Sequence, residues 1–359
     1  MKKTIVLSFS TFIVSCCYAQ AASVMKSFDG YGLEYTIDYL EAKDVSRAVV
    51  LIHGSGPHDM DEDLSGVSAP GTKNLFFVDV SSALIKKGFA VIRYNKRSYQ
   101  WKLTAQKDPS FIKSAGFKKF SDNPLKYFVE DAASFAKFAS TTFPKAKVYL
   151  IGHSEGAQIA LQVADKNPSV SGAALIGFTA QSLDISMFEQ TVYRPLYIFE
   201  GLDLDKNGAL DQDELNKDAI LGKSLNGQLP SLDLNKNGLL ERSEFMAGNF
   251  TNILLDAPSL PEYRKQEVLY KKPVAIIKDA KFDIAFFQGE LDNQAPAYNA
   301  KAVQIMNNLV WKKPNLHFHF FEGLGHALDK RTDFQDIVYR QADPQALTDM
   351  ASDLDSFWK

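Results

Sequence analysis

The chain has 359 residues, 45% of them hydrophobic and 12% aromatic, so it can form one large domain with an insertion, or two domains. Charged residues make up 23%, and the formal net charge of −3 argues against nucleic-acid binding by bulk electrostatics. Beyond the first 21 residues, no apolar run is long and charge-free enough to span a bilayer.

Residues 1–21 have the features of a signal peptide. Lys2 and Lys3 precede an uncharged apolar run over residues 4–14, and small residues follow at positions 19 and 21. This order of positive start, apolar core and small-residue cleavage site is typical of export signals. We therefore expect a secreted or periplasmic protein.

Both cysteines of the chain, Cys16 and Cys17, lie in this segment. Cleavage after Ala21 would leave a mature protein without a thiol or a disulfide. Residues 13–16, Ile-Val-Ser-Cys, also resemble the lipobox of bacterial lipoproteins. Lipid anchoring at Cys16 therefore stays open beside plain secretion, which is slightly favoured.

Apolar runs alternate with helical patterns along most of the chain, which is typical of a mostly parallel sheet with helices on both faces. Residues 98–121 interleave lysines with aromatics and are interpreted as a solvated surface loop. The prediction is an α/β core over 22–180 and 276–359, with a mainly helical cap over 181–275. The expected strands are 48–52, 89–94, 148–151, 172–178, 282–287 and 316–321, after a hairpin within 28–40, and the expected helices are 74–87, 122–140, 158–165 and 344–358.

A Gly-x-Ser-x-Gly pentapeptide marks the candidate nucleophile. Residues 152–156 read Gly-His-Ser-Glu-Gly and stand between a predicted strand and a predicted helix. A serine in such a turn takes a strained conformation, and the two glycines let strand and helix pack closely. The turn exposes the hydroxyl and points the helix N-terminus at developing negative charge. Ser154 is therefore the predicted nucleophile.

The partners of a catalytic serine follow in the expected order. A serine hydroxyl needs a histidine to take its proton, and the histidine needs a carboxylate to fix its tautomer. Asp292 and then His326 occupy glycine-containing turns just after predicted strands, which is the order that follows such an elbow. They are the predicted acid and base, and Glu290 is the rival for the acid.

An oxyanion hole is expected beside this serine. The glycine-rich loop 53–57 follows an early predicted strand and should lie against the elbow. The backbone N–H groups of Glu155 and of Ser55 or Gly56 are the expected donors.

Five short motifs together carry a resemblance to a known family. They are His53-Gly54-Ser55-Gly56-Pro57, Arg93-Tyr94-Asn95-Lys96-Arg97, Gly152 to Gly156, Gln288-Gly289-Glu290-Leu291-Asp292 and Gly323-Leu324-Gly325-His326. They resemble motifs of α/β-hydrolases of the bacterial dienelactone-hydrolase or acyl-peptidase-like kind, over about residues 25–180 and 275–359. The resemblance implies an α/β-hydrolase fold and a serine hydrolase. One departure lies outside the triad, at Asn95 and Ser98, where relatives usually have Asp and Gly.

The remaining histidines are interpreted as structural. His317 and His319 alternate on a predicted strand and should face one side of the sheet. His58 stands in an acidic stretch over 58–63 and is expected to be a surface partner of those acids. His153 is held within the elbow, where it cannot easily face the Ser154 hydroxyl.

The cap contains two segments that match the EF-hand calcium loop. That loop has oxygen side chains at positions 1, 3, 5 and 9, glycine at 6, a backbone carbonyl ligand at 7 and glutamate at 12. The expected Ca²⁺ ligands of the first loop are Asp203, Asp205, Asn207, Ala209, Asp211 and Glu214. Those of the second loop are Asp233, Asn235, Asn237, Leu239, Glu241 and Glu244.

The two calcium loops are expected to form a pair of unequal affinity. Leu210 and Leu240 hold position 8 in each loop and should pair with each other. The first loop offers more carboxylates than the second, so it should bind Ca²⁺ more tightly. Pro230 is expected to shorten the helix that enters the second loop. In an exported protein we expect calcium to brace the cap rather than to act as a signal.

The leading interpretation is an exported serine hydrolase that cleaves carboxylic esters of a small-molecule acyl substrate. Thioesterases and serine peptidases use the same triad and stay open as alternatives. An alternative from another class is a calcium-dependent extracellular interaction protein on a hydrolase scaffold. No nucleic-acid partner is expected.

Overall fold

The computed structural model describes residues 18–19, 23–40, 45–181, 183–217, 221–247 and 270–358. Most of the predicted leader, including Cys16, lies outside these ranges. Tyr18–Ala19, labelled β1, pairs antiparallel with β3 (Gly32–Tyr39). Cleavage after Ala21 would remove β1 and leave β3 paired with its other neighbours, β2 and β5.

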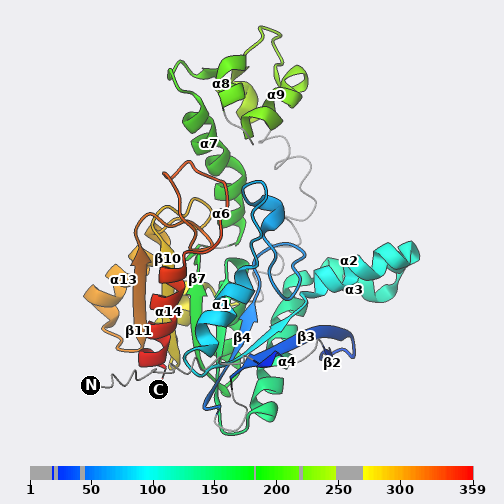
Figure 1. The fold of residues 1–359 in the computed structure, drawn as a ribbon, viewed down its shortest axis with the longest axis vertical. Helices are drawn as coiled ribbons and strands as arrows, with labels where there is room; N and C mark the ends of the chain where they lie inside the picture. Colours follow the sequence, from blue (N-terminus) through cyan, green and yellow to red (C-terminus); the bar gives the residue numbers. More distant parts are fainter. Residues whose placement is uncertain are drawn as a thin grey trace, which may run out of the picture.

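A nine-stranded, mostly parallel sheet forms the centre of the molecule (Figure 1). The strand order is β1-β3-β5-β4-β6-β7-β10-β11, with β2 also paired to β3. Only the pairings of β3 are antiparallel within this described sheet, so the carboxyl ends of β4, β6, β10 and β11 meet at one edge. The strands span Ser23–Lys26 (β2), Arg47–Ile52 (β4), Ala90–Tyr94 (β5), Lys147–His153 (β6), Val170–Ile176 (β7), Asp283–Gly289 (β10) and Leu316–Phe321 (β11).

Helices cover both faces of this sheet, as alternate residues of β4 show. Val49 and Leu51 belong to one buried cluster with side chains of α1 and α14, whereas Ala48 and Val50 belong to another with side chains of α4, α5 and α12. Burial on both faces explains the continuous apolar runs and confirms the predicted α/β class. No helix in the described ranges combines the length and apolar character that crossing a bilayer requires. The helices span Phe76–Ile85 (α1), Pro124–Thr142 (α4), Glu155–Lys166 (α5), Pro273–Asp279 (α12), Tyr298–Met306 (α13) and Pro344–Phe357 (α14).

The leading hairpin is confirmed but begins earlier than expected. Its first strand is β2, and residues 27–31 form the turn rather than part of a strand. Gly30 has φ 83° in this turn, a conformation that favours glycine. The Asp29-Gly30 pair therefore marks the turn itself.

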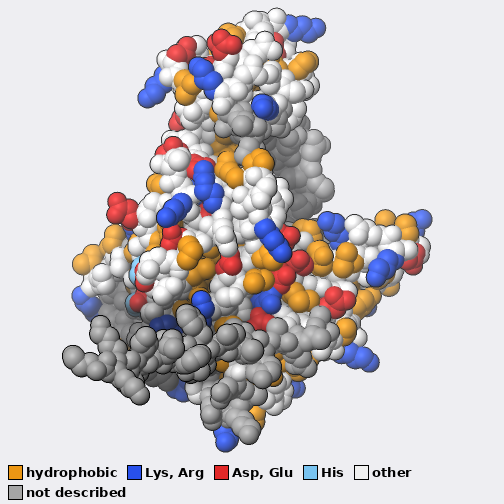
Figure 2. All heavy atoms as spheres, viewed as in Figure 1, with side chains coloured by type: hydrophobic (Ala, Val, Ile, Leu, Met, Phe, Trp, Pro, Cys, Tyr) orange, Lys and Arg blue, Asp and Glu red, His pale blue; other side chains and the backbone are white. Residues whose placement is uncertain are grey.

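The prediction of a surface loop over 98–121 is wrong. The segment folds into α2 (Arg97–Lys107), the 3-10 helix η3 (Pro109–Lys113) and α3 (Ala115–Asp122), and projects from the sheet as an arm (Figure 1). Trp101 is only 1% exposed and packs against aromatic rings of α3, and it belongs to the same buried cluster as side chains of α4 and of the sheet. Figure 2 shows basic side chains interspersed with hydrophobic ones on this arm, a mixture that hides the helical period in the sequence.

The segment between β7 and α12 contains helices and the two acidic loops, and its described part extends away from the sheet (Figure 1). Buried residues Phe199, Leu202, Leu210, Leu215, Leu240 and Phe245 form a separate cluster there. Its elements are α6 (Leu183–Phe188), the π-helix η4 (Glu189–Tyr193), α7 (Arg194–Leu202), β8 (Ala209–Leu210), α8 (Gln212–Lys217), α9 (Leu221–Leu232) and β9 (Leu240–Glu241).

The expected effect of Pro230 is wrong. Helix α9 continues through Pro230 to Leu232, and the Asp233 N–H donates to the Leu229 carbonyl at 2.8 Å. A proline lacks an N–H and its ring crowds the carbonyl one turn earlier, but residues beyond it can still bond to carbonyls before it.

Candidate active site

The predicted nucleophile lies in a sharp turn between β6 and α5. Ser154 has φ 55° and ψ −118°, a region in which a residue with a side chain is strained. A Cβ atom at Gly152 would lie 2.1 Å from the Gly156 carbonyl oxygen, and one at Gly156 would lie 2.0 Å from the Ile52 carbonyl oxygen. Both glycines are therefore required by the close packing of strand and helix.

Asp292 and His326 form a buried hydrogen-bonded pair. Asp292 lies in the turn after β10 and His326 in the loop after β11, the parallel neighbour of β10. The His326 Nδ1 atom lies 2.8 Å from Asp292 Oδ2, and the two side chains are 3% and 0% exposed. This contact can hold the imidazole in the tautomer whose Nε2 accepts a proton. Glu290, the rival acid, pairs instead with Lys301, with 2.6 Å between Oε1 and Nζ.

The surroundings of Asp292 stabilise its ionised form. Burial alone would raise the pKa of Asp292. The charge and hydrogen bond of His326, together with backbone N–H groups of Ala295 and Gln294 at 2.8 Å, outweigh burial and lower that pKa below its ordinary value. The Gln288 amide also donates to Oδ2 at 2.9 Å. The carboxylate can therefore balance a positive imidazole.

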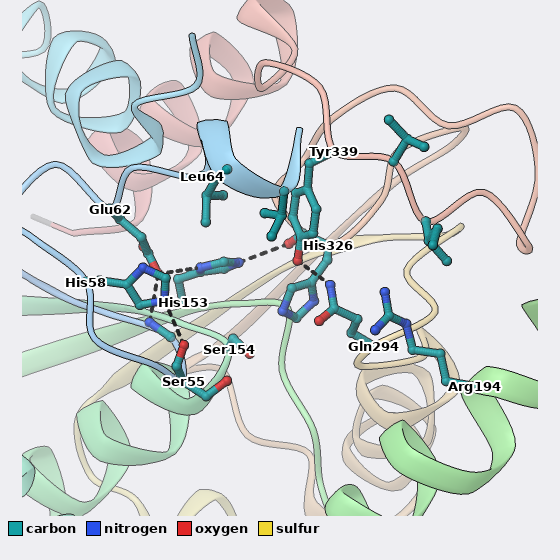
Figure 3. A pocket seen from close by; sticks show the side chains of 15 residues that line it. Ser55, His58, Glu62, Leu64, His153, Ser154, Arg194, Gln294, His326 and Tyr339 are labelled. Atoms are coloured by element: carbon teal, nitrogen blue, oxygen red, sulfur yellow. Dashed lines mark hydrogen bonds and ion pairs between the residues drawn. The ribbon is translucent and has the colours of Figure 1, made fainter. Parts of the chain in front are cut away.

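Ser154 and His326 line the same cavity, of about 470 Å³ (Figure 3). Ser55, Arg194 and Tyr339 also line it. Among the described residues, no hydrogen bond joins the Ser154 hydroxyl to the His326 ring, and such bonds are often long until substrate binds. The structure thus places the predicted nucleophile and the predicted base on one cavity, with the predicted acid hydrogen-bonded to that base.

The position of the His326 ring depends on close contacts with two other strand ends. Gly177 follows β7 with φ 62°, and a Cβ atom there would lie 2.8 Å from both Cε1 and Nδ1 of the ring. His153 Nε2 lies 3.3 Å from the His326 carbonyl oxygen, and the two imidazole rings lie 4.8 Å apart, centre to centre. The imidazole is therefore confined between the elbow and Gly177.

The glycine-rich loop after β4 lies against the elbow. A Cβ atom at Gly54 would lie 3.2 Å from Ser154 Cβ. The Gly54 N–H already donates to a carboxylate. Within the described residues, the N–H groups of Ser55, Gly56 and Glu155 have no hydrogen-bond acceptor. These three predicted donors are thus available to a substrate oxygen.

Known proteins match parts of this sequence. A family model described as "Serine aminopeptidase, S33" matches residues 113–192, which include the elbow. The curated Esterase EstD of Thermotoga maritima is 32% identical over 146 residues, or 41% of this chain and 30% of the esterase. The match therefore spans less than a third of that relative's length.

Solved structures match nearly the whole chain. Est1E from Butyrivibrio proteoclasticus superposes with a TM-score of 0.50 at 13% identity, over 94% of this chain and 98% of Est1E. A lipase in its open form superposes with a TM-score of 0.52 at 19% identity, over 95% of this chain and 98% of the lipase. A puromycin-hydrolyzing peptidase of Mycobacterium tuberculosis gives 0.51 at 12%, over 98% of this chain and 40% of the peptidase. The chain has the α/β-hydrolase fold.

A buried ion pair that no sequence motif indicated lies beside the candidate triad. Glu62 Oε1 accepts the Gly54 N–H at 2.8 Å and lies 3.0 Å from His153 Nδ1. Burial would raise the pKa of Glu62, but the charge and hydrogen bond of His153 outweigh burial and lower it to about 2. Burial would lower the pKa of His153, but Glu62 outweighs burial and raises it. The geometry therefore favours a charged pair.

No sequence signal identified Glu62, because it stands in an acidic run typical of a solvated loop. Its φ of 46° and complete burial are visible only in the fold. His58 lies in the same loop, with its Nε2 atom 2.7 Å from the Ser55 carbonyl oxygen. Its charge also lowers the pKa of Glu62, so His58 interacts electrostatically with one of the acids of this stretch.

The alternating histidines of β11 face one side of the sheet, as predicted. His317 Nε2 and His319 Nδ1 lie 3.0 and 2.7 Å from the same oxygen, Oδ2 of Asp353 on α14. The shared carboxylate ties the last strand to the terminal helix.

The Asn-Lys-Arg-Ser segment, which departs from the family pattern, is well anchored. Lys96 Nζ lies 2.7 Å from Glu155 Oε2 and also donates to the Gly54 carbonyl. Arg97 is fully buried and holds Asp131 through two hydrogen bonds of 2.6 and 2.8 Å. Lys96 therefore ties the glycine-rich loop to the first residue of α5.

The two candidate calcium loops share one backbone pattern. In each, the first aspartate accepts hydrogen bonds from the N–H groups at positions 5 and 6, and positions 4 and 6 have positive φ. The angles are 58° at Lys206, 85° at Gly208, 59° at Lys236 and 83° at Gly238. This repetition indicates that both segments fold as the same kind of loop.

The side-chain oxygens of the first loop converge. Carboxylate oxygens of Asp203, Asp205 and Glu214 lie within 4.8 Å of one another. Asp211 accepts the Glu214 N–H at 2.8 Å, and the Asn207 side chain accepts the Ala209 N–H, also at 2.8 Å. Oxygen donors at this spacing suit a hard cation such as Ca²⁺.

The second loop has a similar set of internal hydrogen bonds and pairs with the first. Glu244 accepts the N–H groups of Leu234 and Asn235 at 2.8 and 2.9 Å. Strands β8 and β9 are antiparallel and place Leu210 opposite Leu240, as predicted. The other expected side-chain ligands accept hydrogen bonds within the loop. The Asn235 and Asn237 side-chain oxygens accept the backbone N–H groups of Asn237 and Leu239. The Glu241 carboxylate accepts a side-chain N–H of Asn237, and the Asp233 carboxylate accepts the backbone N–H of Gly238.

Proposed function

We propose that this α/β-hydrolase cleaves carboxylic esters through an acyl-enzyme, with Ser154 as nucleophile, His326 as base and Asp292 as the orienting carboxylate. The buried 2.8 Å contact between Asp292 and His326, with Ser154 on the same cavity as His326, carries the proposal. The esterase name of the Thermotoga maritima relative supports an ester over other acyl substrates.

In the acylation step, Ser154 Oγ attacks the acyl carbonyl carbon while His326 Nε2 accepts the hydroxyl proton. Asp292 stabilises the imidazolium that forms. Negative charge develops on the carbonyl oxygen, where the N–H groups of Glu155 and of Ser55 or Gly56 can donate to it. Glu155 is the first residue of α5, so the positive helix N-terminus adds to this stabilisation.

The tetrahedral species then collapses and releases the alcohol. His326 gives its proton to the leaving oxygen as the ester C–O bond breaks, which leaves an acyl group on Ser154. In the second half, His326 takes a proton from water, and the resulting nucleophile attacks the acyl carbon. Return of the proton to Ser154 Oγ releases the carboxylic acid.

Labelling and mutation of Ser154 test this proposal. A fluorophosphonate probe should label the wild type, and Ser154→Ala should lose both labelling and turnover of p-nitrophenyl acetate, by roughly 10³-fold or more. Turnover by Ser154→Ala at the wild-type rate would contradict the assignment. Calcium-dependent capture of a protein partner without labelling would favour an interaction protein instead.

A panel of matched ester, thioester and peptide substrates separates the remaining alternatives, because all three classes use the same triad. The family model described as a serine aminopeptidase covers the elbow but neither Asp292 nor His326, so it does not favour peptides. We expect the highest kcat/KM for esters.

We also propose that the paired loops bind two Ca²⁺ ions and brace the cap, the first loop more tightly. The convergent oxygens around Asp203 and the Leu210–Leu240 pairing support this proposal. Export, as a free or Cys16-anchored protein, is proposed from the leader alone, and a comparison of cell fractions tests it.

A further inference from the structure

A second cavity, of about 440 Å³, lies between the arm and the catalytic loops. Most of its lining comes from α2, η3, α3 and the start of α4. The apolar side chains of this lining include Trp101, Ala105, Ile112, Phe117, Phe120 and Phe128. We call this cavity the arm pocket. Its size is in the range of pockets that bind small molecules.

The arm pocket reaches the proposed oxyanion hole. Gly56 and Glu155, two of the proposed donors, line it, and Glu155 is the neighbour of Ser154. A group bonded to a carbonyl whose oxygen occupies that hole can therefore extend into this pocket. The pocket is thus adjacent to the place where chemistry is proposed.

The position of His326 decides which half of an ester extends into the arm pocket. His326 must reach the leaving oxygen to protonate it, so the alcohol half belongs in the cavity that His326 lines. His326 lines the first cavity with Ser154 and is absent from the lining of the arm pocket. The acyl half is therefore the part directed to the arm pocket.

The walls of the arm pocket are held by packing and by a paired charge. The Trp101 ring lies 4.8 Å from that of Phe120 and 5.9 Å from that of Phe117, centre to centre. Lys96 lies 4.4 Å above the Phe128 ring, and its charge is paired with Glu155. An apolar group can thus enter without desolvating an unpaired Lys96 charge.

We propose that the arm pocket binds the acyl chain and makes the enzyme selective for esters of medium-length apolar acids. This inference rests on the proposed esterase function. Each methylene buried on binding should raise kcat/KM about fourfold until the pocket is filled. In the wild type, kcat/KM should therefore rise from p-nitrophenyl acetate through butyrate and hexanoate to octanoate.

Filling the pocket tests the proposal. Ala105→Trp should lower the ratio of kcat/KM for octanoate to that for acetate by at least about tenfold, because the indole occupies the space of several methylenes. Gln106→Trp is the matched control, since Gln106 is exposed on the same helix and does not line the pocket. That control should keep the wild-type ratio. Ile112→Ala provides a second test at a half-exposed lining residue and should lower the same ratio about fourfold or more.

The outcomes separate this inference from the proposed function. If the wild type hydrolyses none of these esters, the esterase proposal itself fails. If it hydrolyses acetate but Ala105→Trp and Ile112→Ala keep the wild-type chain-length profile, the arm pocket is not the acyl site. A series of acetate esters with lengthening alcohols completes the test. If Ala105→Trp changes how kcat/KM depends on the length of the alcohol, the arm pocket binds the alcohol and the inference is overturned.

Discussion

At the residue scale, the orientation of His326 depends on a glycine that belongs to no catalytic motif. A Cβ atom at Gly177 would lie 2.8 Å from the imidazole, closer than such atoms can approach without movement. Gly177→Ala should therefore displace the ring and lower kcat for p-nitrophenyl acetate by about 100-fold, since displacements of 1 Å at a catalytic group cost that much. Steady-state kinetics and near-ultraviolet circular dichroism would measure activity and folding together.

Gly88 supplies the control for backbone strain alone. It has φ 78°, close to the value at Gly177, but a Cβ atom there would meet nothing within 4 Å. Gly88→Ala should lose a similar amount of stability while kcat stays within about twofold of the wild type. Equal losses of kcat in the two variants would show that strain, rather than contact with the imidazole, explains the effect.

At the element scale, the strands were predictable and the arm was not. A strand buried on both faces reads as a continuous apolar run, so β4, β6 and β11 lie within two residues of their predicted bounds. Helix α2 buries little beyond Trp101 and Arg97, which contact Tyr31 of the hairpin and Asp131 of α4. A helix with so narrow a buried stripe lacks the amphipathic period that sequence patterns detect.

The candidate site also has residues that the sequence predicts and residues that it does not. The positions of Asp292 and His326 follow from strand order, because the loops after parallel strands meet at one edge. The Glu62–His153 pair and the contact of Gly177 with His326 arise from loops brought together by the whole fold, and no local pattern marks them. Sequence motifs therefore predict the triad residues, but they do not predict the residues that position them.

At the same scale, the proposed calcium loops predict how thermal stability depends on Ca²⁺. Chelation at constant ionic strength should lower the thermal midpoint by roughly 5–10 °C, since a ligand at 100 times its Kd contributes about 2.7 kcal/mol. Glu214→Gln should remove the tighter binding step and Glu244→Gln the weaker one, because position 12 gives a bidentate carboxylate. Calorimetric titration with Ca²⁺ would resolve the two steps.

Asp213→Asn is the matched control, as Asp213 is exposed in the first loop at a position that provides no ligand. It should keep both binding steps. A thermal midpoint that does not respond to Ca²⁺ or chelator would refute the bracing role.

At the scale of the whole molecule, the Glu62–His153 pair joins three strand ends that are far apart in the sequence. Glu62 bonds to the Gly54 loop and to the elbow residue His153, and His153 reaches the His326 carbonyl. Removing one charge from a buried pair leaves the other without compensation, which costs roughly 3 kcal/mol. Glu62→Gln should therefore lower the free energy of unfolding by about that amount and also reduce kcat, since all three loops carry proposed catalytic groups.

The pH dependence of the stability loss in Glu62→Gln shows whether the charge of Glu62 causes that loss. The pKa of Glu62 is lowered from 4.5 to about 2, so its stabilisation is complete above pH 4.5 and is lost as the pH falls toward 2. The pKa of His153 is raised from 6.5, so its stabilisation is complete below pH 6.5 and is lost as the pH rises through the raised value. The difference in unfolding free energy between wild type and Glu62→Gln should thus be largest between pH 4.5 and 6.5, and should shrink as the pH falls toward 2 and as it rises through the raised pKa of His153. Urea unfolding over a series of pH values measures this difference, with Glu322→Gln at an exposed position as the control. A difference that is constant with pH would mean that Glu62 acts through shape and hydrogen bonding alone, because only a charged pair gives stability that falls on both sides of this window.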